Sequence, residues 1–375
     1  MYIPYGRQSI NEEDIAAVVE ALKSDFLTTG PKVEEFEERI AEYTGVKYAV
    51  AVANGTAALH VACLAAGIGA GDEVITTPLT FAASANCVLY CGGTPVFADV
   101  NPDTYNIDPE DMERKITEKT RAIIPVHFTG QPCDMDEIHR IAKKYGLMVI
   151  EDGAHALGAE YKGKIIGGLS DMTTISFHPV KHITTGEGGI VLTNNEELYK
   201  RLSLFRTHGI TRDTSLMTEN EGDWYYQQLV LGYNYRISDI QCALGISQLK
   251  RLPEFLEKRW EIAKRYDKAF LDMPEYKRPK QLENTKNSWH LYLIQTPEGR
   301  RKEIFDGLRR AGIGANVHYI PVYKHPYYQE NGYRDVFCRN AEKIYENLIS
   351  LPIYPALKVE EQEYVIENLE KLRKK

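Results

Sequence analysis

Cysteine pairs of the zinc-binding kind are absent from this sequence. No CxxC pair and no zinc spacing occurs among the six cysteines, which are Cys63, Cys87, Cys91, Cys133, Cys242 and Cys338. Cysteines placed in this way suit a reducing compartment, where they pack as small hydrophobic side chains. We therefore expect no metal site.

An excess of positive charge is lacking too. The 375 residues include 45 Lys plus Arg and 53 Asp plus Glu, which gives a net charge of -8. The one dense basic run, EKLRKK at the C-terminus, is interpreted as the solvated end of a helix. We therefore expect no nucleic-acid partner.

Uncharged stretches are few, and the longest does not predict a membrane span. Residues 48–71 contain no Asp, Glu, Lys or Arg and are long enough to cross a bilayer. They include four glycines and His60, however, and divide naturally into a strand, a turn and a helix. The first residues, MYIPYGRQSINEED, contain no apolar signal core. We expect a cytoplasmic protein without membrane contact.

What the sequence does contain is a regular alternation of short apolar runs and helical segments. A chain of this length predicts two domains, and we divide it into an N-terminal arm (1–12), a large α/β domain (13–250) and a small α+β domain (251–375). The expected strands of the large domain lie at 48–53, 73–77, 95–100, 121–126, 147–152, 172–177 and 190–192. Their apolar runs lack clean alternation, which favours a mostly parallel sheet covered on both faces. In the small domain, we expect strands at 289–296 and 315–320.

A lysine stands at an unusual point in SFHPVKHITTGEGG (176–189). Lys181 follows an apolar run that reads as a buried strand, and a glycine-rich turn then leads to a second apolar strand. Lysine is seldom buried without a partner. In a partly dry pocket its amine has a lowered pKa and acts as a nucleophile, most familiarly in a Schiff base with pyridoxal phosphate (PLP).

A PLP site also needs a carboxylate near the pyridine nitrogen, donors for the phosphate and walls for the ring. In VIEDGAHALGA (149–159), Asp152 stands just past the end of an apolar strand, where ligands of open α/β sheets bind. A carboxylate there would keep the pyridine nitrogen protonated. From this stretch alone, a loop aspartate that caps a helix is an equally good interpretation.

Phosphate donors are predicted in ANGTAALHVA (53–62), where a strand ends in a glycine turn that opens a helix. The N–H groups of Thr56 and Ala57 would point at an anion, assisted by the Thr56 hydroxyl, although an ordinary N-cap is preferred for this segment alone. Ser176 offers another hydroxyl, although most strand-end serines bond nearby backbone. Phe81 offers a ring to stack on the cofactor, although a lone aromatic is usually core.

Eight segments together carry a resemblance that covers nearly the whole chain: LTTGP (27–31), NGTAAL (54–59), TFAASAN (80–86), GGTPVFADVNPDTYNID (92–108), EDGAHALGA (151–159), SFHPVKHITTGEGG (176–189), FRTHG (205–209) and GYNYRISDIQ (232–241). With them, the chain resembles the PLP-dependent sugar aminotransferases of the DegT/DnrJ/EryC1/StrS family. The resemblance implies PLP-dependent transferase fold type I, with a mostly parallel central sheet, helices on both faces and a smaller C-terminal α+β domain.

The resemblance also implies roles for single residues. Lys181 resembles the Schiff-base lysine, which later moves the proton, and Asp152 the partner of the pyridine nitrogen. A branch of the family with His at this lysine position performs sugar 3-dehydration, so Lys181 favours transamination. The remaining matches are to the phosphate site (Thr56, Ala57 and Ser176), the ring-stacking position (Phe81), a place near the phenolic oxygen (His155) and an asparagine that reaches the neighbouring subunit's phosphate (Asn234). The last match implies an obligate homodimer with shared active sites.

The implied reaction has two halves. L-glutamate gives its amino group to the cofactor, which becomes pyridoxamine phosphate, and a nucleotide-linked keto sugar then accepts it. Several segments, including VHYIPVYKHPYYQ (317–329), are most similar to the C4 aminotransferases of pseudaminic acid synthesis, which act on UDP-2-acetamido-2,6-dideoxy-β-L-arabino-hexos-4-ulose. Tyr5, His318 and Tyr319 are candidate sugar contacts; a small-domain core with a surface loop is an equally good interpretation of the tract.

Three alternatives differ in substrate or in class. In the first, the acceptor is another UDP- or dTDP-linked keto sugar, such as a precursor of perosamine or of 4-amino-arabinose. The second, a dinucleotide dehydrogenase, is rejected because Asp72 replaces the third glycine in GIGAGD (67–72) and the glycines follow a helix. The third is a non-catalytic PLP-binding protein, which the intact Lys181 and Asp152 disfavour.

Overall fold

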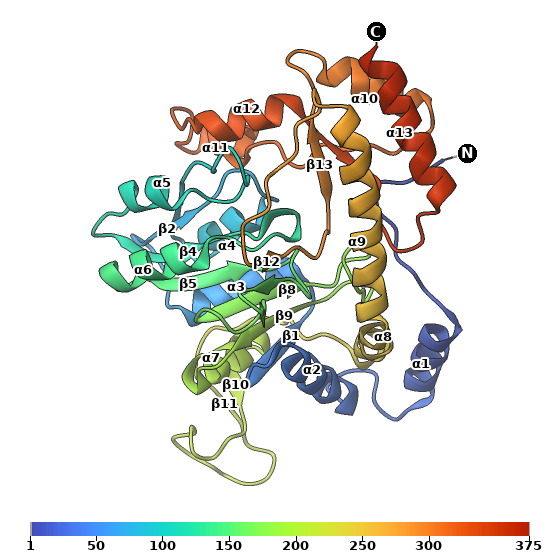
Figure 1. Cartoon of the computed structure of the whole chain (residues 1–375). Coiled ribbons are helices and arrows are strands. Elements are labelled where there is room, and N and C mark those ends of the chain that lie inside the picture. The colour runs from blue at the N-terminus through green and yellow to red at the C-terminus, as the bar shows by residue number, and fades with distance from the viewer. Residues whose placement is uncertain (1, 375) are drawn as a thin grey trace.

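A seven-stranded sheet forms the centre of the larger part of the molecule in this computed structural model, which describes residues 2–374 (Figure 1). The strands lie in the order β1 (Tyr48–Val52), β9 (Gly189–Thr193), β8 (Met172–Ser176), β5 (Met148–Asp152), β4 (Thr120–Ile124), β2 (Glu73–Thr76) and β3 (Thr94–Phe97). Neighbours from β8 to β3 are parallel, and β9 runs antiparallel to both β8 and β1. The mostly parallel sheet expected from the sequence is confirmed.

Helices cover both faces of this sheet, which explains why its strands read as unbroken apolar runs. In β1, Val50 and Val52 pack into one buried cluster, whereas Ala49 and Ala51 pack into another on the opposite face. The first face is covered by α3 (Gly55–Ala65), α4 (Ala83–Tyr90) and α7 (Glu196–Arg206). The other is covered by α2 (Pro31–Thr44), α8 (Asp239–Lys250), α5 (Pro109–Arg114) and α6 (Met135–Tyr145).

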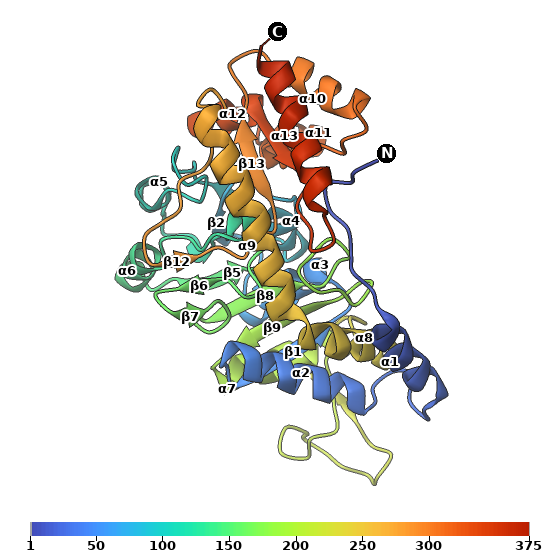
Figure 2. The same cartoon turned by 45° about the vertical axis from the view of Figure 1, so that its right-hand side comes forward.

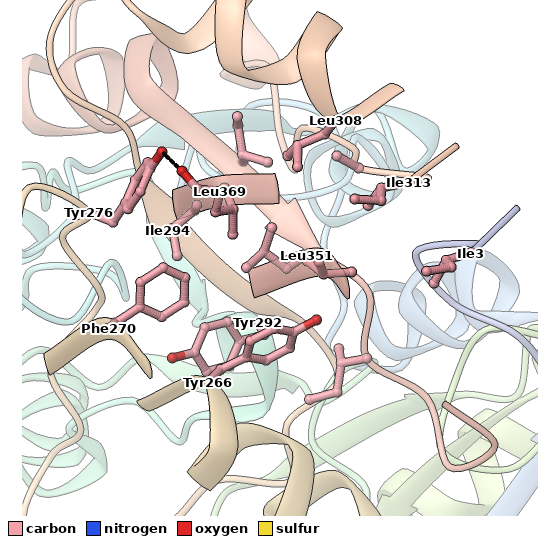
Figure 3. Close-up of a cluster of buried hydrophobic side chains, with 14 of the residues drawn as sticks. Ile3, Tyr266, Phe270, Tyr276, Tyr292, Ile294, Leu308, Ile313, Leu351 and Leu369 are labelled. Carbon is pink, nitrogen blue, oxygen red and sulfur yellow. Dashed lines mark hydrogen bonds between the residues drawn. The ribbon is translucent and has the colours of Figure 1, made fainter. Parts of the chain in front are cut away.

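A second core lies in the C-terminal part of the chain. There β13 (Tyr292–Gln295) pairs antiparallel with β14 (Leu348–Leu351) and packs with α10 (Arg301–Arg310) and α13 (Val359–Arg373). Figure 3 shows aromatic and aliphatic side chains of this buried cluster. The Tyr276 hydroxyl donates to the Leu369 carbonyl at 3.1 Å. The other elements are α1 (Glu12–Lys23), α11 (Pro326–Glu330), α12 (Arg339–Asn347), η1 (Phe128–Gly130), η2 (Phe270–Asp272), η3 (Val322–Lys324), β6 (Glu160–Tyr161), β7 (Lys164–Ile165), β10 (Ile210–Thr211), β11 (Gln227–Gln228) and β12 (Thr285–Lys286).

Helix α9 (Leu252–Ala269) joins the two cores (Figure 2). Phe255, near its start, packs in the sheet core, whereas Tyr266, about three turns further on, packs in the second core. From the N-terminal segment, Ile3 is buried in the second core and forms an isolated bridge with Ile313. The division at residues 250/251 predicted from the sequence remains a proposal. No helix among residues 2–374 is long and apolar enough to cross a membrane.

The strand expected at 315–320 is wrong. Within this segment only Asn316 forms a bridge, to Ser350, and the residues that follow line a cavity instead of a sheet. The side chain of His318 is fixed by a 2.8 Å contact between its Nδ1 and the Ser350 hydroxyl. Four consecutive residues, 316–319, line the cavity, so the segment forms part of its wall and does not pair along its length.

A carboxylate from α8 caps the start of α2. Helix α2 begins after Gly30, which has no side chain to cap it. Asp239 is 1% exposed, and its two oxygens accept the N–H groups of Gly30 at 2.8 Å and Lys32 at 2.9 Å. A side chain at position 30 would meet Phe26 Cβ at 2.4 Å, so glycine is required there. The helix start and α8 are thereby held together.

We predict that Asp239→Ala destabilises the fold by about 1–2 kcal/mol, because two partly buried N–H groups lose their acceptor. Denaturant unfolding followed by circular dichroism measures the effect. The control is Asp108→Ala, which removes a more exposed cap from the short helix α5. An Asp239 effect no larger than that of Asp108 would contradict the prediction.

Candidate active site

The C-terminal ends of β5 and β8 open into a cavity of about 810 Å³. Ten of the eleven residues singled out from the sequence line it: Tyr5, Thr56, Ala57, Phe81, Asp152, His155, Ser176, Lys181, His318 and Tyr319. Asn234 does not line this cavity; it is exposed and forms a bridge with Thr207. Residues spread over more than 300 positions therefore meet in one site.

Lys181 lies in the turn that follows β8, and its N–H donates to the His178 carbonyl at 2.9 Å. The residue is half-buried, and its Nζ is 3.4 Å from Nε2 of His290. Burial lowers the pKa of the amine to about 8, the Asp152 carboxylate opposes this change, and the Arg259 guanidinium adds to it. At pH 7 about a tenth of the amine is thus unprotonated, far more than for a lysine with its ordinary pKa.

Asp152 is the last residue of β5 and is 4% exposed. Its Oδ2 accepts a hydrogen bond of 2.6 Å from the Ser84 hydroxyl, and its Oδ1 accepts one of 3.1 Å from the Ala154 N–H. Ser84 is also 2.8 Å from the Thr80 hydroxyl. The next α-helix along the chain, α7, begins only at Glu196, so Asp152 does not cap a helix. The carboxylate is instead held in place at the cavity wall.

The start of α3 forms another wall. Asn54 caps this helix, and its Oδ1 accepts the Ala57 N–H at 2.8 Å, so the N-cap interpretation describes this contact. Of the two amides named from the sequence, the Thr56 N–H is the one left for an anion among the described residues. Thr56 and Ser176, which carry hydroxyl groups, line the same cavity. A Cβ at Gly55 would lie 2.9 Å from Ser176 Cβ, so only glycine lets these two segments approach.

Four buried histidines surround the lysine: His155, His182, His290 and His318. Burial lowers the pKa of each, with further lowering from the Lys181 charge, and that of His318 falls to about 4. The rings of His155 and His290 lie 4.3 Å apart, and His155 Nε2 is 3.2 Å from the Tyr319 hydroxyl. The histidines are therefore neutral near pH 7 and add no positive charge beside the amine.

Sequence reasoning missed Ser84 and His290. Ser84 stands within TFAASAN, but no local pattern shows that its hydroxyl meets Asp152, 68 positions away. His290 lies in an apolar run, WHLYLI, where a histidine reads as core, and its partner Lys181 is 109 positions away. Both contacts depend on how distant segments pack.

The residues present fit PLP. The cavity combines an amine of lowered pKa, a carboxylate fixed by two donors, a helix start with a free amide, and His155, whose buried Nδ1 has no hydrogen-bond partner among the described residues. Together with the mostly parallel sheet, this arrangement defines a PLP-dependent enzyme of fold type I.

The chain belongs to the DegT/DnrJ/EryC1/StrS aminotransferase family, whose sequence pattern matches residues 8–370. It is 43% identical over 372 residues to the spore coat polysaccharide biosynthesis protein SpsC of Bacillus subtilis, covering 98% of this chain and 96% of SpsC. It is 42% identical over 373 residues to the UDP-4-amino-4,6-dideoxy-N-acetyl-beta-L-altrosamine transaminase of Campylobacter jejuni strain 81-176, covering 98% and 96%. The solved structure of Helicobacter pylori PseC, an aminotransferase involved in the biosynthesis of pseudaminic acid, superposes with a TM-score of 0.92 at 36% identity and 99% coverage of both chains. The protein is a PLP-dependent sugar aminotransferase.

We predict that Ser84→Ala weakens PLP binding roughly 10-fold or more, because Asp152 loses its short hydroxyl donor. Titration of cofactor-free protein with PLP, followed by fluorescence, measures the affinity. Ser203→Ala, which removes a hydroxyl bonded only to the Tyr199 carbonyl within α7, is the matched control. Equal affinity in the Ser84 variant and the control would show that the hydroxyl does not position Asp152.

Proposed function

We propose that the enzyme transfers the amino group of L-glutamate to C4 of a UDP-linked 4-keto-6-deoxy sugar, UDP-2-acetamido-2,6-dideoxy-β-L-arabino-hexos-4-ulose, in pseudaminic acid synthesis. The observation that carries the proposal is that Lys181 and Asp152 share one cavity with an aromatic and histidine wall. Support for the substrate comes from the Campylobacter transaminase and from PseC, which match the chain over almost its full length.

The wall has a chemistry that suits such a sugar. Tyr5 and His318 lie with ring centroids 5.2 Å apart, and Tyr319 lies 4.8 Å from His318. Aromatic faces suit the apolar face of a deoxy sugar, and hydroxyl and imidazole groups suit its polar edge. The cavity of about 810 Å³ is large enough for a cofactor together with the reacting end of a substrate.

Each residue then has a defined task in the proposed reaction. PLP supplies the electron sink when it is bound, and Asp152, held by Ser84 and Ala154, would lie at its pyridine nitrogen. The Thr56 amide and the hydroxyls of Thr56 and Ser176 would hold its phosphate. Lys181 Nζ, unprotonated in part because its pKa is about 8, takes a proton from the donor and later returns one to the sugar carbon.

We further propose a cytoplasmic homodimer with shared active sites. Beside Asn234 the chain exposes Leu229, Val230 and Leu231, the last 77% exposed. Phe81, at the cavity, is also 61% exposed. A second copy that packs on these apolar side chains would remove them from water and bring its Asn234 to the phosphate site. All six cysteines are unpaired thiols, which fits a reducing compartment.

We predict that L-glutamate removes the visible absorbance band of the lysine-bound cofactor and that the L-arabino 4-keto UDP sugar restores it.

We also predict that Lys181→Ala lowers turnover by at least about 1,000-fold, since it removes both the amine and the proton carrier. The control is Lys200→Ala, which changes an exposed lysine paired with Glu196. Stopped-flow absorbance measures both half-reactions.

Two results would contradict parts of this proposal. If glutamate removes the band but only a different keto sugar, such as a perosamine or 4-amino-arabinose precursor, restores it, the pseudaminic substrate is wrong. If glutamate leaves the band unchanged, amino transfer from this donor is wrong. Turnover of the Lys181 variant at the native rate would refute the role of the lysine.

Mixed dimers test the shared sites. Lys181→Ala and Asn234→Asp each inactivate their homodimers, because the second variant places a carboxylate against the phosphate. Co-expression with two different tags yields heterodimers in which one site is intact if Asn234 acts across the interface. We predict that purified heterodimers regain about half of the native activity. Recovery of none would show that each subunit uses its own Asn234.

A further inference from the structure

Arg259 is an arginine buried without a carboxylate partner. It lies in α9 and is 0% exposed, and no acidic side chain among residues 2–374 forms an ion pair with it. Its Nη1 donates to the carbonyls of Trp289 at 3.0 Å, His290 at 3.4 Å and Ile353 at 3.2 Å, while its buried Nε has no partner. Burial lowers the pKa of the guanidinium to about 10, so it stays charged near neutral pH.

Such a cation is costly to bury, because carbonyl dipoles replace water less well than a carboxylate does. A neutral donor such as a glutamine amide can serve a backbone carbonyl without the cost of burying a charge. The position of the charge therefore calls for a reason beyond packing, and the nearest chemistry is the active site.

The carbonyls that Arg259 binds belong to the segment that carries His290. In this segment Trp289 has a positive φ of 52°, and its N–H donates to Asn287 Oδ1 at 2.7 Å. Trp260, the neighbour of Arg259 on α9, donates from its ring nitrogen to the Asn287 carbonyl at 2.6 Å. Helix α9 thus holds the segment at two points and fixes where the His290 ring lies.

The His290 ring is the side chain that contacts the reactive amine. Its Nε2 lies 3.4 Å from Lys181 Nζ, and its buried Nδ1 has no partner among the described residues. His182, which follows the lysine, brings Nε2 to 3.0 Å from the Ser288 carbonyl and so ties the lysine turn to the same segment. A path of direct contacts therefore leads from Arg259 to the amine.

The charges that act on the amine oppose each other. Asp152 favours the charged amine and Arg259 disfavours it, whereas the four histidines are neutral near pH 7. The other titratable groups that line the cavity are Tyr5, Tyr90, His178, Glu187, Tyr235 and Tyr319. Asp152 raises the pKa of Lys181, and the positive charge of Arg259 lowers it.

We propose that Arg259 is a positioning residue for Lys181: by holding the carbonyls of Trp289 and His290 it aims the His290 ring at the amine, and it adds a buried positive charge to the path of contacts that leads there. The inference rests on the proposed role of Lys181. It assigns a task in amino transfer to a residue of α9 that does not line the cavity.

The test measures how readily Lys181 reacts in the full-length chain freed of PLP. A small amine-directed reagent is applied across a range of pH, and mass spectrometry of the peptide that contains Lys181 gives the rate. The native midpoint is expected near pH 8. Arg259→Met and Arg259→Gln, which remove the charge, should raise this midpoint and slow the reaction at pH 7 roughly three- to tenfold.

Arg259→Lys keeps the charge and should keep the midpoint close to the native value. Arg265→Met is the matched control, because Arg265 lies on the same helix but bonds Gln362 at 2.8 Å, away from the cavity. Turnover with PLP provides a second reading: the deficit of the Met and Gln variants should shrink as pH rises, since a higher pH restores the unprotonated amine. Thermal unfolding shows whether each variant is folded. If Arg259→Met does not fold, the result for Arg259→Gln decides.

The inference holds only if the neutral variants raise the midpoint and the lysine variant does not. A native midpoint in Arg259→Gln, or the same shift in Arg259→Lys, would overturn it and leave Arg259 as a structural tie. Failure of the proposed function looks different: native protein would then not bind PLP through Lys181, or Lys181→Ala would turn over normally, whatever the Arg259 variants do.

Discussion

The parallel pairing of β5 with β8 is the constraint on which the site depends. In its register Asp152 lies opposite Thr174, so β8 ends two residues later at Ser176 and the lysine turn follows at the same edge of the sheet. Parallel strands bring their carboxyl ends to one edge, and helix starts in βαβ units return to that edge as well. An amine, a carboxylate and the start of helix α3 are thereby brought together at one cavity.

Burial then sets the chemistry of what the sheet has gathered. The same desolvation that lowers the pKa of Lys181 to about 8 also keeps His155, His182, His290 and His318 neutral. A cluster of charged imidazoles beside the amine would repel it and compete for Asp152. Neutral rings instead offer polar atoms without adding charge, so the effects of Asp152 and Arg259 on the pKa of the amine are not overridden by a cationic cluster.

Much of the fold and several site residues could be predicted from the sequence, because the end of a strand can be recognised from the residues around it. Lys181 and Asp152 each follow an apolar run, and the glycine turn before α3 is visible in NGTAAL. The rest depends on packing between distant segments, which no local pattern records: Ser84 reaches Asp152, and His290 reaches Lys181, only once the chain is folded. The segment 315–320 misled for a related reason, because nothing in ANVHYI shows whether a partner strand lies beside it, and in the structure only Asn316 forms a bridge.

The geometry of the site depends on how the two cores pack against each other. The amine is held by the sheet core, whereas the tract 316–319 of the cavity wall is tied to β14 of the second core. Helix α9 is common to both cores, since Phe255 packs in the first and Tyr266 in the second. Arg259 lies between these two anchors and donates to the carbonyls of Trp289 and His290. The segment that carries His290 is also bonded to the part of the chain that holds the amine, because the Ser288 N–H donates to the Gly130 carbonyl at 3.1 Å and His182 Nε2 lies 3.0 Å from the Ser288 carbonyl. The position of His290, 3.4 Å from Lys181 Nζ, is therefore set jointly by helix α9 and by the loops at the edge of the sheet.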